Sequence, residues 1–257
     1  MDFPGTALTL PLGAVQTTML VAVRMVAFLV IAPPFSQRAI PAGVKVALAT
    51  GLALAVAPGM DQVEQDSTAG FVGALVLQAT IGAATGFLVY LLFSAVQAAG
   101  SLIDLFGGFQ IAAAFDPLSM SSGAQFSRLY QLLAIVLLFA SDGHHMVLTG
   151  LVRTFDALPL GLSFAPAELA STLTDGLTGM FVAALQIAGP LLVVLFLADV
   201  GLGLLTRVSP ALNAFALGFP LKILLTLTLG GFAVLALPGV VSTLSGQTLT
   251  LVPEVLR

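Results

Sequence analysis

The chain carries no charged side chain between Asp66 and Asp104, a stretch made largely of alanine, glycine, leucine and valine. A helix of roughly 20 apolar residues is enough to cross the hydrocarbon core of a bilayer. A run of this length without charged side chains cannot form a water-exposed surface, so its natural surroundings are lipid or other apolar protein. We therefore expect an all-α chain of membrane-type helical hairpins with broken helices.

The overall composition points the same way. Of 257 residues, 58% are hydrophobic and 8% are charged, and the mean hydropathy is +1.11. Soluble domains carry about 25% charged residues, so the composition predicts an integral membrane protein. A net charge of −4 gives no electrostatic case for nucleic acid. The absence of cysteine excludes disulfides, thiolate catalysis and cysteine-bound zinc.

Six apolar segments can be recognised, at about 10–32, 42–58, 69–99, 129–152, 176–206 and 211–238. Breaks rich in proline or glycine separate several of them, at 33–41, 58–68 and 159–168. Basic residues favour the cytoplasmic side, which would place Arg38, Arg128 and Arg207 there and both termini outside. The N-terminus has no basic n-region, so we expect the first segment to be retained as its own insertion signal.

Four charged residues lie inside these apolar segments: Arg24, Lys45, Asp199 and Lys222. A charge near the bilayer centre costs about 2.5 kcal/mol or more, so such residues usually face protein or a water-filled cavity. One interpretation is structural, with Lys45 reaching the interface and Asp199 paired with Arg24 or Lys222. The other is an ion or proton path, and the pattern leaves the pairing open.

Both histidines of the chain lie in the stretch SDGHH, residues 141–145. Adjacent helical residues diverge by about 100°, so we expect His144 and His145 not to share a metal, and we predict no metal site. Asp142 and Gly143 are expected to bend or end a helix. No catalytic nucleophile and base and no phosphate-binding motif can be recognised, so we predict neither an enzyme nor a cofactor.

The stretch GAATG, residues 82–86, places two glycines four residues apart. Small residues at this spacing let helix backbones approach closely in lipid. The motif is compatible with packing inside the chain or against a partner subunit. Gly201 and Gly203 offer a second glycine-rich surface.

Four longer motifs follow one another along nearly the whole chain. Residues 24–58 contain a proline break and then P-x-x-V-K-x-x-L-A, and residues 198–227 contain P-x-L-N followed by FPLKI. Between them lie GSLIDLFGGFQIAAAFDP at 100–117 and a segment at 139–161 that begins FASDGHH. Together and in this order they resemble the FliR-type flagellar export-gate family, whose injectisome relatives are of the SctT type. The sequence LNAFALGFPLKI favours the flagellar branch.

The residues that carry the resemblance are limited in number. They are Gly108, Phe109, Phe115, Asp116 and Pro117 in the central loop; Asp142, Gly143, His144, Phe155 and Pro159 in the third motif; and Pro210, Asn213, Phe219, Pro220 and Lys222 in the last. Two pairs depart from the family pattern. They are Arg153-Thr154 before Phe155, and Ala113-Ala114 before Phe115, which makes the loop less bulky.

The resemblance implies a helical, multi-subunit export gate in the bacterial inner membrane, within the flagellar basal body. One copy of the chain would join FliP-like and FliQ-like subunits, with FlhA-like and FlhB-like export components beside them and membrane lipid around them. Residues 1–175 would form a FliP-like part and residues 176–257 a FliQ-like part. Unfolded proteins would pass through the channel, and much of the assembled chain would lie on the periplasmic side.

In such a gate, residues 106–123 would form a plug in the channel. Phe106, Phe109, Ile111 and Phe115 can supply a dry constriction, which gates by excluding water. Gly107 and Gly108 permit backbone conformations closed to other residues, and Asp116-Pro117 is a turn starter. The alternative for this loop is re-entrant packing without gating. The alternative for the whole chain is a six-span transporter of ions or small solutes, although we find no internal repeat of the kind many transporters show.

Overall fold

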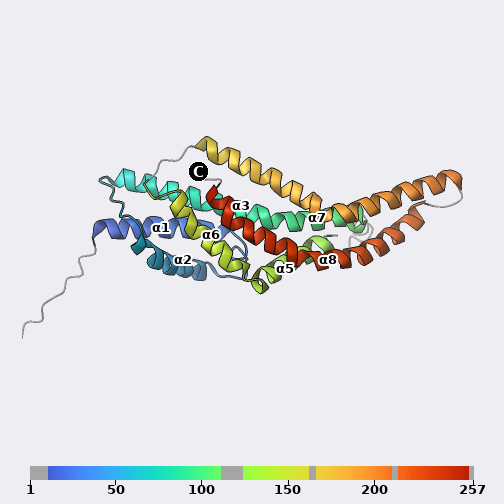
Figure 1. Ribbon diagram of the computed structural model, residues 1–257, viewed down its shortest axis with the longest axis horizontal. Helices are drawn as coiled ribbons and strands as arrows, with labels where there is room; N and C mark the ends of the chain where they lie inside the picture. The colour runs from blue at the N-terminus through green and yellow to red at the C-terminus, as the bar shows by residue number, and fades with distance from the viewer. Residues whose placement is uncertain (1–10, 111–123, 162–165, 210–213, 255–257) are drawn as a thin grey trace, which may run out of the picture. The chain divides into compact units, whose positions relative to one another are not determined.

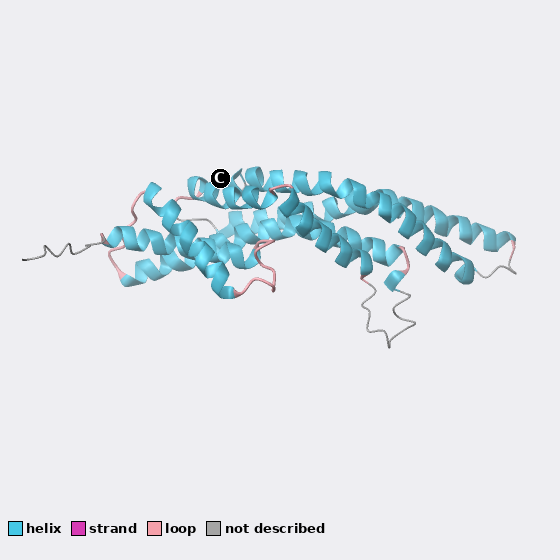
Figure 2. Cartoon of the chain, turned by 90° about the horizontal axis from the view of Figure 1, so that it is seen from below, coloured by secondary structure: helices cyan, strands magenta, loops and turns pink. Residues whose placement is uncertain are grey.

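The computed structural model describes residues 11–110, 124–161, 166–209 and 214–254, and within these ranges every regular element is a helix (Figures 1 and 2). The all-α prediction is therefore confirmed. The elements are α1 (Leu12–Ile31), α2 (Ala42–Val56), the short 3-10 helix η1 (Ala57–Gly59), α3 (Thr68–Phe106), α5 (Gln125–Ala140), α6 (Gly143–Ala157), α7 (Pro166–Val208) and α8 (Ala214–Glu254).

Five helices are long and apolar enough to cross a membrane, and α5 and α6 can form a sixth span that is bent by 79°. These agree with the six predicted segments. However, α3, α7 and α8 contain 39, 43 and 41 residues and exceed the predicted segments. At 1.5 Å per residue they are roughly 58 to 65 Å long, about twice the hydrocarbon thickness of about 30 Å. A simple six-span arrangement therefore leaves much of these helices outside a bilayer.

The chain forms two compact units. Unit 1 consists of Met1–Tyr90, Val147–Thr172 and Leu249–Arg257, and unit 2 consists of Leu91–Met146 and Leu173–Thr248. Helices α3, α6, α7 and α8 each contribute residues to both units, and most of α7 and α8 belongs to unit 2. The predicted division at residue 175, which rests on likeness to partner subunits, stays a prediction.

Unit 1 has a close crossing of α1 and α3 at the GAATG motif. A Cβ atom on Gly82 would collide with the carbonyl oxygen of Arg24, and one on Gly86 would lie 2.9 Å from the carbonyl oxygen of Phe28. Both contacts are with backbone, which cannot rotate away. The motif therefore packs within this chain, whereas a Cβ atom on Gly201 or Gly203 would meet nothing within 4 Å.

The acidic break after α2 is attached to α1 in unit 1. The Val63 N–H donates to Thr17 Oγ1 at 2.9 Å, and the Gln65 N–H donates to Gln16 Oε1 at 2.8 Å. Backbone donors of a turn need a partner, and here two side chains of α1 supply it. The turn predicted at 58–68 is confirmed, since η1 and an irregular segment lie there.

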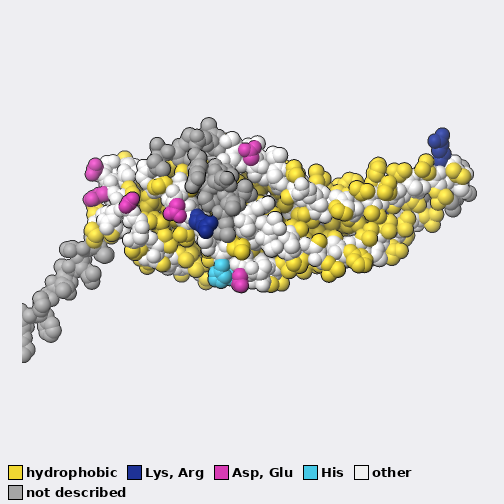
Figure 3. All heavy atoms as spheres, in the orientation of Figure 1, with side chains coloured by type: hydrophobic (Ala, Val, Ile, Leu, Met, Phe, Trp, Pro, Cys, Tyr) yellow, Lys and Arg dark blue, Asp and Glu magenta, His cyan; other side chains and the backbone are white. Residues whose placement is uncertain are grey.

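The parts of α7 and α8 that belong to unit 2 run antiparallel as a long hairpin with a largely hydrophobic surface (Figures 1 and 3). Within an apolar 18-residue stretch of each helix, only 22% is buried in α7 and 17% in α8, against 50% in α3. Large side chains on this hairpin are exposed, among them Phe181, Phe196, Phe232 and Leu235. An apolar surface of this kind requires lipid or another protein to cover it.

Candidate functional site

The apolar loop predicted to be functional is held at its base by a buried carboxylate. Asp104 lies near the end of α3 and is 0% exposed. Its Oδ1 accepts the Phe126 N–H and its Oδ2 accepts the Ser127 N–H, each at 2.9 Å. These N–H groups belong to the first turn of α5, where an α-helix has no acceptors of its own. One side chain thus joins the two helices on either side of the loop.

Glycines let the helices come together around this point. A Cβ atom on Gly100 would lie 2.7 Å from the carbonyl oxygen of Phe126, so α3 and α5 touch backbone to backbone. Next to this contact, Ser101 Oγ donates to Ser127 Oγ at 3.1 Å. We call Ser101, Asp104, Phe126 and Ser127 the loop base.

Aromatic rings extend the loop base toward the loop. The rings of Phe109 and Phe126 meet edge to face with centroids 5.5 Å apart, and Phe126 meets Tyr130 in the same way at 6.2 Å. Gly108 has φ +86°, in the left-handed region that favours glycine. The predicted special backbone conformation at this position is therefore present, and an aromatic row begins where the loop begins.

The structure describes the loop only at its first residues. Phe106, Gly107, Gly108 and Phe109 are described, and Phe106 is 39% exposed. Some predicted site residues lie outside the described residues: Ile111, Phe115, Asp116 and Pro117 of the loop, and Pro210 and Asn213 of the last motif. Phe219 and Pro220 lie on α8, and a Cβ atom on Gly108 would lie 3.5 Å from the Phe219 ring.

Of the two partners considered for Asp199, the structure of unit 2 shows Lys222. Lys222 Nζ of α8 lies 2.7 Å from Asp199 Oδ1 of α7, and the two side chains are 21% and 46% exposed. The pair lies on the apolar hairpin, where an unpaired charge is costly in lipid or against protein. Lys45 is half-buried on α2.

Exchanging these two charges tests the pair. Lys222→Asp alone and Asp199→Lys alone each place like charges together, and we expect each to lower the amount of stable protein in the membrane. The double variant restores an opposite pair and is expected to recover most of the loss. Membrane levels of a tagged chain, compared by immunoblot, measure this. Double-variant levels no higher than those of the worse single variant would show that the pair does not stabilise the hairpin.

Arg24 is the largest fully buried side chain of the described residues, and in unit 1 it binds neutral acceptors. Its Nε donates to Gln78 Oε1 at 2.6 Å, and its two terminal nitrogens donate to the carbonyl oxygens of Thr154 at 3.1 Å and Leu158 at 2.9 Å. Its guanidinium carbon lies 4.2 Å from the centroid of the Phe155 ring. Carbonyls at a helix C-terminus carry partial negative charge and attract a cation. Arg24 therefore acts as a cap for the end of α6.

Gln78 completes this cluster. It is 0% exposed, and its Nε2 donates to the carbonyl oxygen of Leu160 at 3.3 Å. Side chains from α1 and α3 thus bind the chain where it leaves α6. Phe155 of the third motif contributes the aromatic face, while Pro159 lies in the turn that follows.

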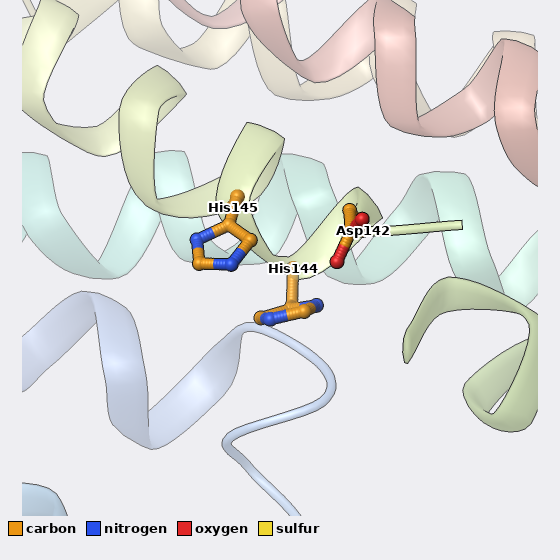
Figure 4. A group of neighbouring side chains, drawn as sticks. All are labelled: Asp142, His144 and His145. Atoms are coloured by element: carbon orange, nitrogen blue, oxygen red, sulfur yellow. The ribbon is translucent and has the colours of Figure 1, made fainter. Parts of the chain in front are cut away.

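The stretch SDGHH forms the predicted bend. Helix α5 ends at Ala140 and α6 begins at Gly143, and Asp142 between them has φ +54°. The two histidine side chains nevertheless lie next to each other. The rings of His144 and His145 lie 4.2 Å apart, and with Asp142 they place one ligand atom each within 4.8 Å of one another (Figure 4). Both residues belong to the first turn of α6.

These three side chains could supply ligands to one ion. Imidazole nitrogen and carboxylate oxygen are ligands that zinc accepts. Three protein ligands leave one position of a tetrahedral site open, and Asp142 and His145 are exposed. The prediction of no metal site stays a prediction, which a zinc titration of the purified chain would test.

Comparison with known proteins assigns the family. The family described as bacterial export proteins, family 1, matches residues 15–248, which is nearly the whole chain. The chain belongs to this family. It is 35% identical over 208 residues to the flagellar biosynthetic protein FliR of Escherichia coli strain K12, covering 80% of this chain and 78% of that protein.

Two further relatives show the breadth of this export family. The FliR protein of Bacillus subtilis strain 168 is 30% identical over 211 residues, covering 80% of this chain and 81% of that protein. The surface presentation of antigens protein SpaR of Shigella flexneri is 29% identical over 147 residues and covers 57% of both chains. The predicted family resemblance is therefore confirmed. None of these relatives is named as an enzyme.

Within this export protein, the residues that organise the loop base and the α6 cap are not apparent from the sequence. Asp104 stands out there only as the end of an uncharged stretch, and Gln78 is one polar residue in an apolar run. Position 124, just before α5, is alanine, whose side chain cannot cap a helix. The sequence around α5 therefore does not indicate which residue accepts its first N–H groups. The sequence signal that could have pointed to Asp104 is a single acidic residue at the end of an uncharged stretch, next to a predicted loop.

Proposed function

We propose that this chain is a subunit of the flagellar type III protein export gate in the bacterial inner membrane. With FliP-like and FliQ-like subunits it forms the channel through which unfolded flagellar proteins leave the cytoplasm, next to FlhA-like and FlhB-like components. The observation that carries the proposal is the family match over residues 15–248, together with relatives named flagellar biosynthetic protein FliR.

Two features of the fold support an assembled channel over an isolated bundle. Helices α3, α7 and α8 are about twice as long as one bilayer crossing requires. The α7–α8 hairpin also leaves most of its apolar stretches uncovered within the chain. Partner subunits that cover this hairpin would allow much of it to lie beyond the bilayer, on the periplasmic side.

We further propose that residues 106–123 plug the channel of the gate. The loop starts from a rigid base formed by α3 and α5, and aromatic side chains begin at that base. A ring of apolar side chains excludes water and therefore ions. Since the loop carries an alanine run at 112–114, neighbouring subunits are expected to supply part of the seal.

The gate assignment is tested by removing the chain from its own bacterium. Cells without it are expected to lack flagellar filaments and to stop swimming, and the tagged full-length chain should restore both. In mild detergent the tagged chain should co-purify with two other small membrane proteins in a large complex. A stable monomer that takes up a small solute, with swimming intact in its absence, would contradict the assignment.

Deleting residues 107–115 tests the plug. We expect the complex to assemble in near-normal amounts and the cells to leak ions or small solutes, because the apolar side chains that exclude water are gone. Membrane potential and entry of a small dye measure the leak, and the pulled-down complex measures assembly. A deletion variant that assembles in a tight membrane would contradict the plug and leave the gate assignment standing.

A further inference from the structure

We infer that Asp104 is the positioning residue of the plug loop, because it joins both ends of the loop and sets where the loop starts. This inference rests on the proposed function of the loop. Asp104 is on α3, 22 and 23 residues from the two α5 residues whose N–H groups it binds. Its bonds therefore bridge the whole loop and are not local helix capping.

The chemistry at this position leaves no substitute for the carboxylate. The residue before α5 is Ala124, which has no side-chain acceptor, and α5 has no side-chain cap of its own. Asp104 supplies two acceptor oxygens to two neighbouring N–H groups at 2.9 Å each. Charge-assisted bonds of this type are stronger than neutral ones, and the positive end of the helix favours a negative group.

Close packing surrounds the loop base. Gly100 brings the α3 backbone against that of α5, and Phe126 is also packed on Gly230 of α8, where a Cβ atom would lie 2.7 Å from its ring. The ring of Phe109, the first aromatic residue after the Gly107-Gly108 pair, rests on the same Phe126. A shift of α5 at its first turn would therefore move the first aromatic side chain of the loop.

Asp104→Asn is the variant that isolates this role. Asparagine keeps the shape, but it turns one acceptor oxygen into an NH2 group that faces an N–H donor. In the full chain within its gate complex, we expect normal assembly and a leak comparable to that of the 107–115 deletion. Asp175→Asn is the matched control, because Asp175 is exposed on α7 and its replacement removes the same charge. It is expected to leave the membrane tight.

A disulfide across the loop base tests whether positioning is the cause. The chain has no cysteine, and the Oγ atoms of Ser101 and Ser127 are 3.1 Å apart, so Ser101→Cys with Ser127→Cys can form a single bridge when oxidised. Adding this bridge to Asp104→Asn should restore the seal, and reductant should open it again. A maleimide-linked polymer adds mass to a chain with free thiols. Bridged chain is therefore recognised because its mass does not shift.

The cysteine pair also gives a readout that does not depend on assembly. With Asp104 present, we expect rapid bridging under mild oxidation, and with Asp104→Asn slower bridging that stronger oxidation brings to completion. Equal bridging rates in both would overturn the inference, as would an assembled Asp104→Asn gate that does not leak. A leak that persists after bridging would overturn it as well. If the 107–115 deletion leaks while Asp104→Asn stays tight, the plug stands and this inference alone fails.

Discussion

Replacing Arg24 with alanine is expected to destabilise the chain by about 3 to 5 kcal/mol, which is enough to remove most of the folded protein from the membrane. The change leaves Gln78 Oε1 and the carbonyl oxygen of Leu158 without their buried donor. Each such unpaired group costs about 1 to 3 kcal/mol, and the lost side chain leaves a cavity as well. The measurement is the temperature at which the detergent-purified gate complex loses its helical signal.

Two further variants separate charge from shape at Arg24. Lysine keeps the charge but cannot reach three acceptors with a planar fork, so Arg24→Lys should fall between the wild type and Arg24→Ala. Arg38 is exposed in the turn after α1, and Arg38→Ala should stay within about 0.5 kcal/mol of the wild type. If Arg24→Met proved as stable as the wild type, the capping of α6 by the guanidinium would contribute nothing to stability.

Replacing Gly82 with alanine is expected to lower stability by about 1 to 3 kcal/mol, although alanine is the better helix former. The added methyl group would collide with the carbonyl oxygen of Arg24. Helix α1 cannot retreat easily, because the side chain of the same residue is bonded to α3 and to the end of α6. The same thermal measurement, together with membrane levels, reports the loss.

Gly201 provides the control for this substitution. It lies within α7, and a Cβ atom there would meet nothing within 4 Å of the chain. Gly201→Ala in the isolated chain should therefore gain up to about 1 kcal/mol from helix propensity. If Gly82→Ala were stabilising to the same degree, the close crossing of α1 and α3 would not be a structural requirement.

Helix existence can be predicted well from this sequence, and helix ends cannot. The apolar segments and their proline-rich breaks locate every described helix, because lipid selects long apolar runs. Helix α3 nevertheless continues past the expected end at residue 99 to Phe106, through Gly100 and Ser101. These residues weaken a helix only slightly in isolation, and here both are held by packing against α5.

The candidate site is predictable only in part. The glycine pair at 107–108, the bend at SDGHH and the charged residues in apolar segments are all visible as patterns. The pairing of Asp199 with Lys222 is one of two possibilities in the sequence, since charge alone does not identify a neighbour. The closeness of the His144 and His145 rings cannot be read from the pattern, because it depends on the conformations of the two side chains.

An all-helical membrane-type chain of the export family can be recognised from the sequence, since composition and ordered motifs depend only on the order of residues. The partners of the buried polar groups follow from the packing of the helices. Asp104 reaches α5 and Arg24 reaches the end of α6, at separations of 22 to 134 residues. A buried charge must find its acceptors or donors, but which segment supplies them is settled only when helices pack.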